Sequence, residues 1–255
     1  MGKRFIRFIL NTIPRKYLIR FSYIFVQLSR FFLRGNNVEC PVCGGRFRKF
    51  LPYGYQVVRE NALCPKCLSL ERHRLVWLFL QNKTGFFRDR LKLLHIAPEQ
   101  SFYKRFKQLK NLEYYTADLE SPLAQYKCDI QHLPFDDDMF DMVMCNHVLE
   151  HVDDDKQALK EIYRVLRKNG FAILLVPVDF KRDTTYEDPS ITDPDERAKI
   201  FGQYDHVRVY GNDYPERIQE CGFEIKGENY LDTLDEKIKD RFKLPRLEFM
   251  YAYFK

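Results

Sequence analysis

The chain has 255 residues, of which 45% are hydrophobic and 15% aromatic. This composition excludes an intrinsically disordered chain and supplies enough apolar side chains for one large core and a smaller appendage. The formal net charge is +6, but residues 1–39 hold eight basic residues and a single acid, Glu39. The rest of the chain is close to neutral and shows no sign of a broad nucleic-acid-binding face, which makes nucleic acid a disfavoured partner.

The first predicted segment, residues 1–38, is a basic amphipathic helical tail. Residues 17–33 are mostly apolar and aromatic, and their few polar side chains recur at steps of three and four, as on one stripe of a helix. Arg20 and Arg30 disfavour a membrane span, and no small-residue cleavage site completes a secretory signal. Two interpretations stay open. Residues 1–34 lie on an anionic membrane surface, or the helix packs on the rest of the protein or on a partner.

Residues 39–70 are predicted to form a zinc-binding module, because they contain two C-x2-C pairs. Cys40 and Cys43 form the first pair and Cys64 and Cys67 the second, with 20 residues between the pairs. Four thiolates at this spacing are typical of a structural Zn²⁺ site, which leaves no open coordination position for chemistry. Disulfides or free thiols are the alternatives, and they are disfavoured because nothing else marks the chain as secreted.

Aromatic residues between the two pairs are expected to form the small core of this module: Phe47, Phe50 and residues 53–55. The three cysteines outside the quartet are expected to be ordinary core residues: Cys128, Cys145 and Cys221. Directly after the quartet, a charged cluster over residues 69–74 opens an apolar helix. It either binds anions or braces the module. Bracing is favoured, since Glu71 and Arg74 have the spacing of a local helix contact.

The third segment, residues 71–255, contains four short apolar runs that predict strands: residues 92–96, 114–117, 140–145 and 171–176. The last run is apolar throughout, which is typical of a strand buried on both faces of a parallel sheet. Residues 155–166 carry apolar side chains at helical spacing, and Gly170 is expected to end this helix. Alternating strands and helices predict a doubly wound α/β sheet whose ligand lies beyond the carboxyl ends of the strands.

Asp118 ends the second predicted strand, 23 residues after His95. Folds of this class bind ribose hydroxyls at that place, because a carboxylate accepts two hydrogen bonds from a 2′,3′-diol. Folds that bind NAD use the same device, so Asp118 alone does not identify the cofactor.

Further motifs follow in chain order: Asp129-Ile130, Leu133-Pro134-Phe135, Phe140-Asp141, Val148-Leu149-Glu150-His151 and Arg164-Val165-Leu166. Together they resemble the class I S-adenosylmethionine-dependent methyltransferases of type 11. The resemblance covers residues 91–255, where residues 221–225 are similar to the sixth strand of that family and residues 249–254 to the seventh. It implies an α/β, Rossmann-like seven-stranded methyltransferase sheet with helices on both faces, preceded by a small zinc-ribbon-like module and an amphipathic helix.

The resemblance implies that S-adenosyl-L-methionine contacts seven residues: His95, Ala97, Glu99, Asp118, Asp129, Ile130 and Asn146. In the family, the acid at Asp129 reaches the adenine amino group. The glycine-rich loop of the family is absent, because Ala97, Glu99 and Ser101 replace its glycines and His95 replaces an acid. We expect Ala97 to keep ordinary backbone angles. Glu99 is expected to pair with a cationic group of the cofactor, which carries no pyrophosphate for a glycine loop to cradle.

Groups for chemistry are expected in the loops after the fourth and fifth strands. His147 follows the fourth strand and is the stronger candidate for a general base, whereas His151 is interpreted as a buried structural histidine. A polar insertion over residues 179–211 is predicted to be a substrate lid, with His206 as a second base. The predicted substrate-binding residues are Tyr204, Asp205, Arg208 and Tyr210. The alternative is a loop held only by its own hydrogen bonds.

The sequence therefore predicts a methyltransferase that acts on a small-molecule, glycan or lipid-linked acceptor by O- or N-methylation. It predicts a cytoplasmic enzyme, with peripheral attachment to the cytoplasmic membrane face under the first interpretation of residues 1–34. Two alternatives remain. One is an RNA methyltransferase whose zinc ribbon binds RNA, which the near-neutral body disfavours. The other is a non-catalytic, membrane-associated scaffold with a degenerate cofactor loop.

Overall fold

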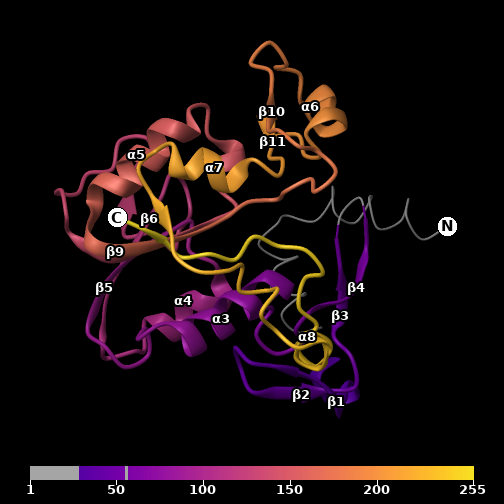
Figure 1. Ribbon diagram of the computed structural model, residues 1–255. Helices are drawn as coiled ribbons and strands as arrows, with labels where there is room; N and C mark the ends of the chain where they lie inside the picture. The colour runs from indigo at the N-terminus through magenta and orange to yellow at the C-terminus, as the bar shows by residue number, and fades with distance from the viewer. Residues whose placement is uncertain (1–28, 55–56) are drawn as a thin grey trace. The chain divides into compact units, whose positions relative to one another are not determined.

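A computed structural model describes residues 29–54 and 57–255, which form two compact units (Figure 1). We call the first the cysteine unit; it comprises residues 29–54 and 57–74 together with residues 235–244. The second, the sheet unit, comprises residues 75–234 and 245–255. The predicted amphipathic tail lies outside the described residues except for its last part, where residues 29–32 are helical.

The cysteine unit contains two antiparallel ribbons: β1 (Arg34–Cys40) with β2 (Gly45–Phe47), and β3 (Leu51–Tyr53) with β4 (Arg59–Leu63). β1 begins at Arg34, so the helical stripe predicted to include this residue ends before it. The start of α3 (Glu71–Lys83) and the whole of α8 (Glu236–Phe242) complete the unit. The methyltransferase segment predicted from the sequence, residues 71–255, includes α8. In the structure, the contacts of α8 join it to β1.

Arg74 organises the interior of the cysteine unit. Its guanidinium is fully buried, lies 4.4 Å from the ring centre of Phe50 and donates to the carbonyl oxygens of Ala62, Ser69 and Phe242. Arg74 was expected to contact Glu71 within the helix. Its hydrogen bonds go to these carbonyl oxygens, and Glu71 accepts a hydrogen bond from Arg59 at 2.9 Å. A buried cation bonded to carbonyl groups ties together segments that are far apart in the sequence.

The expected aromatic core of this unit forms in part. Phe47 and Phe50 are buried, with ring centres 6.1 Å apart, but Tyr53 is 48% exposed. Tyr55 lies outside the described residues. The short strand β3 ends at Tyr53, whose side chain therefore faces solvent and not the core.

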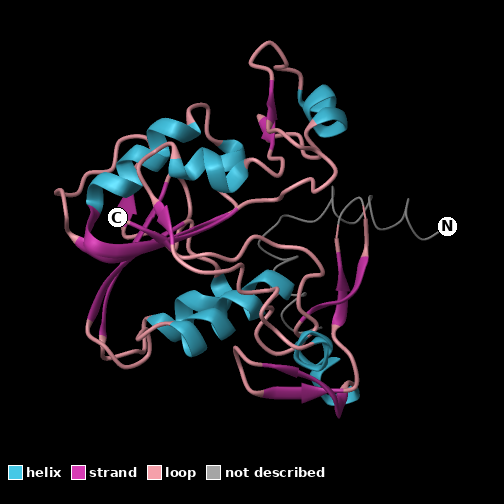
Figure 2. Ribbon diagram, in the orientation of Figure 1, coloured by secondary structure: helices cyan, strands magenta, loops and turns pink. Residues whose placement is uncertain are grey.

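The sheet unit is built on seven strands in the order β12-β13-β9-β8-β5-β6-β7. Figure 2 shows the strands in magenta and the helices in cyan. The strands are β5 (Leu91–Ile96), β6 (Leu112–Asp118), β7 (Tyr126–Lys127), β8 (Phe140–Asn146), β9 (Leu166–Leu175), β12 (Glu224–Ile225) and β13 (Tyr253–Phe254). Five neighbours from β9 to β7 run parallel, whereas β13 is antiparallel to both β9 and β12. All four predicted strands are confirmed, and with them the Rossmann-like methyltransferase fold.

Helices cover both faces of the sheet (Figure 1). The unit contains α4 (Gln100–Phe106), α5 (Asp155–Val165), α6 (Pro194–Ile200), α7 (Tyr214–Gln219), the 3-10 turn η1 (Leu149–His151) and most of α3. Side chains of α5 and α7, such as Leu159 and Ile218, pack in one core with Val143 of β8. On the other face, Trp77 of α3 stacks with Phe102 and Phe106 of α4. β8 is buried along its whole length, as a central parallel strand must be.

The α5 helix begins where the sequence predicts, because the side chain of Asp154 accepts the backbone N–H of Gln157. Its predicted end is wrong in detail. β9 starts at Leu166 without a glycine cap, and Asn169, not Gly170, takes the left-handed conformation, with φ of 65°. Gly170 is required for another reason: a Cβ atom there would lie 2.8 Å from the carbonyl oxygen of Arg167.

The predicted insertion after β9 forms a small substructure of the sheet unit. It contains α6 and the antiparallel pair β10 (Tyr186–Glu187) and β11 (Arg208–Val209). Among residues 29–54 and 57–255, no helix is long and apolar enough to cross a bilayer.

Candidate functional site

Polar side chains gather where β5, β6 and β8 end. These strands are parallel neighbours, so their carboxyl ends lie at one edge of the sheet. Glu99 follows β5, Asp118 ends β6 and Asn146 ends β8. Glu99 and Asn146 are in direct contact, because the Asn146 amide Nδ2 lies 3.2 Å from Glu99 Oε1. Two of the predicted cofactor residues, Glu99 and Asn146, are therefore in contact at the edge where such folds bind ligands.

His95 positions Glu99 and is not itself exposed to a ligand. The ring is completely buried, with Nδ1 at 2.8 Å from the Tyr114 hydroxyl and Nε2 at 2.6 Å from Glu99 Oε2. The prediction that His95 contacts the cofactor therefore needs correction. Both ring nitrogens contact protein side chains, and the contact with Glu99 fixes the direction of the Glu99 carboxylate.

Ala97 does not have the ordinary backbone angles expected for it. Its φ is +49°, in the left-handed region, while its N–H donates to Ala117 O at 2.8 Å. The bend that the family makes with glycine is thus made here by an alanine at an energetic cost of about 1 kcal/mol. His147, at the end of β8, also has a positive φ of 55°. Strained residues at the ends of two neighbouring strands are typical of a functional site.

Asp118 and Asp129 provide further oxygen acceptors. Asp118 is half-buried, and its Oδ1 accepts the backbone N–H groups of Glu120 and Ser121 at 2.7 and 2.6 Å. Asp129 is also half-buried and is held by the amide and backbone N–H groups of Gln131. The side chain of Ile130 lies in the core, so only the backbone of this residue is available to a ligand.

His147 and Glu150 form a pair after the end of β8. His147 Nδ1 lies 3.3 Å from Glu150 Oε1, and the Glu150 carboxylate is buried, with 1% of its surface exposed. Burial alone would raise the pKa of Glu150, but the hydrogen bond and charge of His147 outweigh it and leave the pKa lowered. Sequence reasoning did not single out Glu150, although it is the acid of the Leu149-Glu150-His151 motif.

His151 and His206 are brought together from two distant segments. Their ring centres are 4.7 Å apart and their planes are nearly perpendicular. His151 Nδ1 lies 3.3 Å from the carboxylate of Asp205, and burial lowers the pKa of His206. The interpretation of His151 as a buried structural residue is wrong, because about a third of its side chain is exposed. Tyr204, next in the insertion, is 63% exposed.

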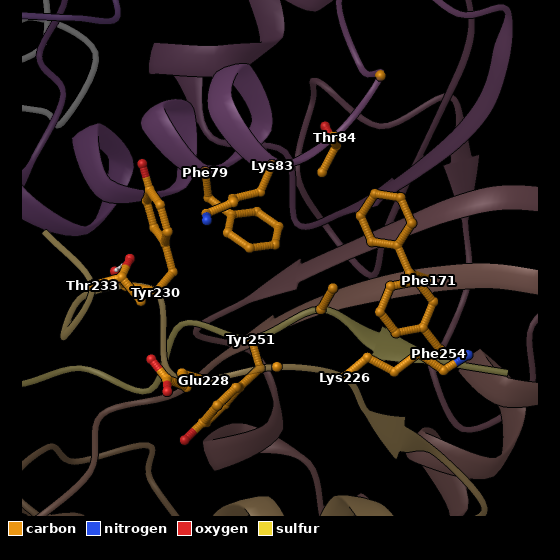
Figure 3. Close-up of a pocket in the computed structure, with 13 residues that line it drawn as sticks. Phe79, Lys83, Thr84, Phe171, Lys226, Glu228, Tyr230, Thr233, Tyr251 and Phe254 are labelled. Atoms are coloured by element: carbon orange, nitrogen blue, oxygen red, sulfur yellow. Dashed lines mark hydrogen bonds between the residues drawn. The ribbon is translucent and has the colours of Figure 1, made fainter.

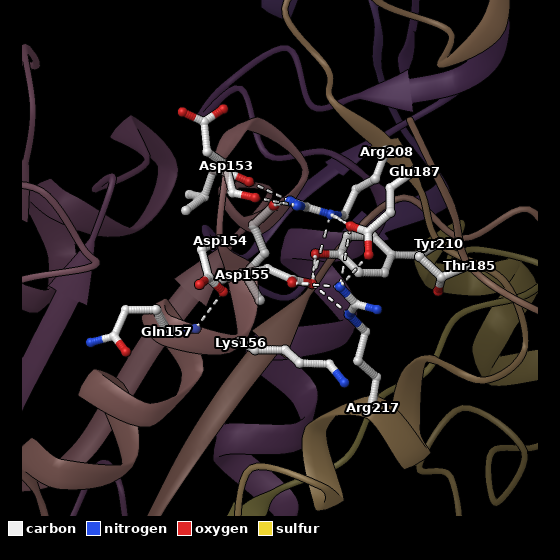
Figure 4. Close-up of polar contacts among 12 residues, drawn as sticks. Asp153, Asp154, Asp155, Lys156, Gln157, Thr185, Glu187, Arg208, Tyr210 and Arg217 are labelled. Carbon is white, nitrogen blue, oxygen red and sulfur yellow. Dashed lines mark hydrogen bonds and ion pairs between the residues drawn. The ribbon is translucent and has the colours of Figure 1, made fainter. Parts of the chain in front are cut away.

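Arg208 and Tyr210 anchor the insertion and do not face a substrate. Arg208 is 3% exposed and donates to the carbonyl oxygens of Leu149 and Val152 and to Glu187. Tyr210 is fully buried, and its hydroxyl donates to Asp155 Oδ2 at 2.7 Å (Figure 4). Their predicted role in substrate binding is therefore replaced by a structural one. Of the four residues predicted to bind substrate, only Tyr204 and Asp205 keep accessible side chains.

The four predicted metal ligands converge in the cysteine unit. Cys40 Sγ is 3.6 Å from Cys67 Sγ, and Cys43 Sγ is 3.7 Å from Cys64 Sγ. Tetrahedral zinc with Zn–S bonds of about 2.3 Å places its sulfur atoms about 3.8 Å apart. All seven cysteines lie in the described part of the chain and each is a free thiol, so the disulfide alternative is excluded in this structure. Ser69 Oγ, 3.1 Å from Cys40 Sγ, supports the cluster.

A cavity of about 480 Å³ lies elsewhere in the sheet unit (Figure 3). Phe171 at the start of the apolar part of β9, Phe254, Tyr230 and Tyr251 supply much of its lining, and Lys83 and Lys226 enter it. None of the predicted cofactor residues lines it. It is therefore separate from the edge of the sheet at which Glu99, Asp118 and Asn146 gather.

Comparisons with known proteins agree with this fold. Residues 87–174 match the family described as a methyltransferase domain. An uncharacterised protein of Methanocaldococcus jannaschii is 52% identical over 48 residues, which are 19% of this chain and 21% of that protein. A demethylmenaquinone methyltransferase of Lactobacillus johnsonii is 42% identical over 52 residues, 20% of this chain and 21% of the relative. The chain thus spans about a fifth of the length of the curated relatives it matches.

One solved structure shows the same fold over most of this chain. The S-adenosylmethionine-dependent methyltransferase of Mesorhizobium loti superimposes with a TM-score of 0.51 at 13% sequence identity, covering 71% of this chain and 98% of that one. At such low identity the likeness establishes the architecture, and the chemistry must come from the residues of this chain.

Proposed function

We propose that the protein is an S-adenosylmethionine-dependent methyltransferase. The observation that carries the proposal is the set of acceptors at the carboxyl ends of β5, β6 and β8, within the segment that matches the methyltransferase domain family. The amide Oδ1 of Asn146 is buried and has no hydrogen-bond partner in the described part of the chain. An orphaned acceptor next to the Glu99 carboxylate fits an ammonium group, and the acceptors at Asp118 fit a ribose diol.

S-Adenosylmethionine supplies an electrophilic methyl group on a sulfonium sulfur. The residues of this chain hold and orient it: Glu99 and Asn146 would bind the amino-acid end, Asp118 the ribose, and Asp129 with the Ile130 backbone the adenine. His147 stands directly after β8 and would take the proton from a hydroxyl or amine acceptor as the new bond forms. Glu150 would stabilise the resulting imidazolium, in the manner of the acid in a catalytic triad.

The acceptor that we propose is a small molecule, a glycan or a lipid-linked intermediate, methylated on oxygen or nitrogen. The accessible Tyr204 and Asp205 of the insertion are the proposed contacts with it, and His206 is the second candidate base. The experiment is to mix the protein with methyl-labelled S-adenosylmethionine and a fractionated cell extract, and to follow the label. Transfer to a small-molecule or lipid fraction supports the proposal. Transfer to RNA alone would favour the RNA-methylating alternative, and absence of cofactor binding would favour a scaffold.

We also propose that Cys40, Cys43, Cys64 and Cys67 hold one structural Zn²⁺ ion. The sulfur separations of 3.6 and 3.7 Å and the mutual approach of all four ligand atoms to within 4.8 Å support a tetrahedral site.

For residues 1–34 we propose attachment to an anionic membrane surface on the cytoplasmic side. The basic amphipathic pattern supports this, and so does the exposure of Phe31 and Phe32 within this segment, at 78% and 75%.

A further inference from the structure

Glu150, His151 and His206 form a cluster in the sheet unit. The proposed methyl transfer gives roles to Glu150 and His206 but none to His151. One nitrogen or oxygen atom of each lies within 4.8 Å of the other two. Glu150 and His151 belong to η1, after the fourth strand of the sheet, and His206 comes from the insertion. Two imidazoles and a carboxylate that converge from separate segments are a common ligand set for divalent transition metals.

Backbone carbonyl groups set the protonation of both imidazole rings. His151 Nδ1 lies 3.2 Å from Asp205 O, and His206 Nδ1 lies 3.2 Å from Phe201 O. A carbonyl oxygen only accepts, so each Nδ1 is the donor in its contact. Nε2 is therefore the nitrogen of each ring that can bind a metal ion. Histidines that bind metals are held in this way, with the second nitrogen donating to a carbonyl or carboxylate group.

Glu150 provides the independent observation that points to a cation. Its carboxylate is 99% buried; Oε1 faces His147, while Oε2 is buried without a hydrogen-bond partner among the described residues. A buried carboxylate oxygen that lacks a partner is costly, and a bound cation would satisfy it. The cluster thus combines two imidazoles with one carboxylate oxygen that lacks a hydrogen-bond partner among the described residues.

We propose that Glu150, His151 and His206 bind a divalent first-row transition-metal ion. Three protein ligands leave coordination positions open, in contrast to the closed four-thiolate site of the cysteine unit. If the proposed function holds, these positions are available to an oxygen atom of the methyl acceptor, whose pKa the ion would lower beside His147. That consequence rests on the proposed methyl transfer, whereas the binding of the ion does not.

The test uses Mn²⁺ as the probe on the full-length protein that carries one Zn²⁺ per chain on its four thiols, with all further zinc removed. Mn²⁺ is suited by carboxylate and not by thiolate ligands, so it reports on this cluster and not on the quartet. We expect one bound Mn²⁺ per chain by electron paramagnetic resonance. Glu150→Gln and His206→Gln should each weaken binding at least about tenfold, as even the loss of an outer-shell partner does at metal sites. His132→Gln, an exposed histidine elsewhere in the sheet unit, is the matched control and should bind as the wild type does.

Circular dichroism of the variants, with zinc on the four thiols and no Mn²⁺, checks that they fold. If Glu150→Gln does not, His151→Gln carries the test, because its side chain is partly exposed and its removal disturbs less of the core. Wild-type protein that binds no Mn²⁺, or variants that bind it with wild-type affinity, overturns the proposal. Calorimetric titration of the zinc-loaded, Mn²⁺-free protein with S-adenosylmethionine separates the two proposals. Cofactor binding without Mn²⁺ binding supports the proposed function and overturns the metal site. Mn²⁺ binding without cofactor binding supports the metal site and overturns the proposed function.

Discussion

Asp155 and Arg217 form an ion pair with two hydrogen bonds that joins the first residue of α5 to α7. Arg217 Nε donates to Oδ2 at 2.8 Å and Nη2 donates to Oδ1 at 2.7 Å, while the Asp155 side chain is 2% exposed (Figure 4). Glu187 of β10 also accepts from Arg217, and Tyr210 donates to Asp155. The insertion is therefore fixed to the helix layer through one buried carboxylate, and that carboxylate has consequences that can be measured.

Replacing Asp155 by Asn should destabilise the sheet unit by about 3–5 kcal/mol at neutral pH, because it leaves two guanidinium groups without their buried partner. Urea unfolding gives the value. Asp153→Asn is the matched control, since that side chain is exposed, and it should change stability by less than about 0.5 kcal/mol. Equal effects of the two substitutions would contradict the assigned role of Asp155.

The same carboxylate predicts how stability depends on pH. Burial tends to raise the pKa of Asp155, but the hydrogen bond from Arg217 and the charge of Arg208 lower it overall. Its contribution is therefore complete above the ordinary carboxyl pKa of about 4 and is lost as pH falls through the lower pKa of the folded state. The stability difference between wild type and Asp155→Asn should shrink below about pH 4. A difference that grows on acidification would refute this.

Cofactor affinity should depend on Asp118. Asp118→Ala removes the ribose acceptor and should weaken S-adenosylmethionine binding by about 1.5–3 kcal/mol, the range for hydrogen bonds to charged groups. Isothermal titration calorimetry measures it, with the exposed Asp136→Ala as a control that keeps wild-type affinity. Unchanged affinity in Asp118→Ala would mean that the cofactor binds elsewhere.

Replacing Ala97 by glycine should raise the stability of the protein, whereas the same substitution at most alanines lowers it. Because its φ is +49°, Ala97→Gly relieves strain and should raise stability by up to about 1 kcal/mol. Ala124→Gly, at a position without a positive φ, should be neutral or should lower stability by about 0.5–1 kcal/mol. Thermal unfolding of the two variants side by side compares them, and a loss of stability in Ala97→Gly would count against the strained turn.

Zinc should be present at one ion per chain. Cys64→Ser should lose it and disorder the cysteine unit, because the ribbons are short and their core is small. Elemental analysis measures the metal, and Cys128→Ser, outside the quartet, should retain it. Protein purified without chelators that contains no zinc would remove the structural-metal proposal.

Deleting residues 1–28 should release the protein from anionic vesicles without abolishing cofactor binding. This cut spares β1 from Arg34 onward, so the cysteine unit stays intact. Flotation with phosphatidylserine vesicles, compared with neutral ones, is the measurement. Full-length protein that never floats indicates a packed tail, and aggregation of the shortened chain would favour that alternative as well.

Periodicity and residue spacing along the chain were sufficient to predict single strands and helices and the cysteine cluster. The strand over residues 140–145 and the helix over residues 155–166 are continuous apolar or periodic runs, and the cysteine spacing predicted the convergence of the four thiols. The role of His95 and the burial of Tyr210 depend on partners far away in the sequence, Tyr114 and Asp155, which no local pattern reveals. The positive φ of Ala97 was not predicted, because residues other than glycine rarely adopt the left-handed conformation.

The assignment of α8 to the cysteine unit bears on how the chain folds during synthesis. The ribbons and all four thiols emerge early, but Phe242 and Lys243, whose carbonyl oxygens receive Arg74, leave the ribosome only after most of the sheet unit. Until then the Arg74 guanidinium lacks two of its acceptors, and the nascent unit is open on that side. Closing it requires contacts of very long sequence separation, which are slow to form. A captured ion would hold the ribbons in place through that interval.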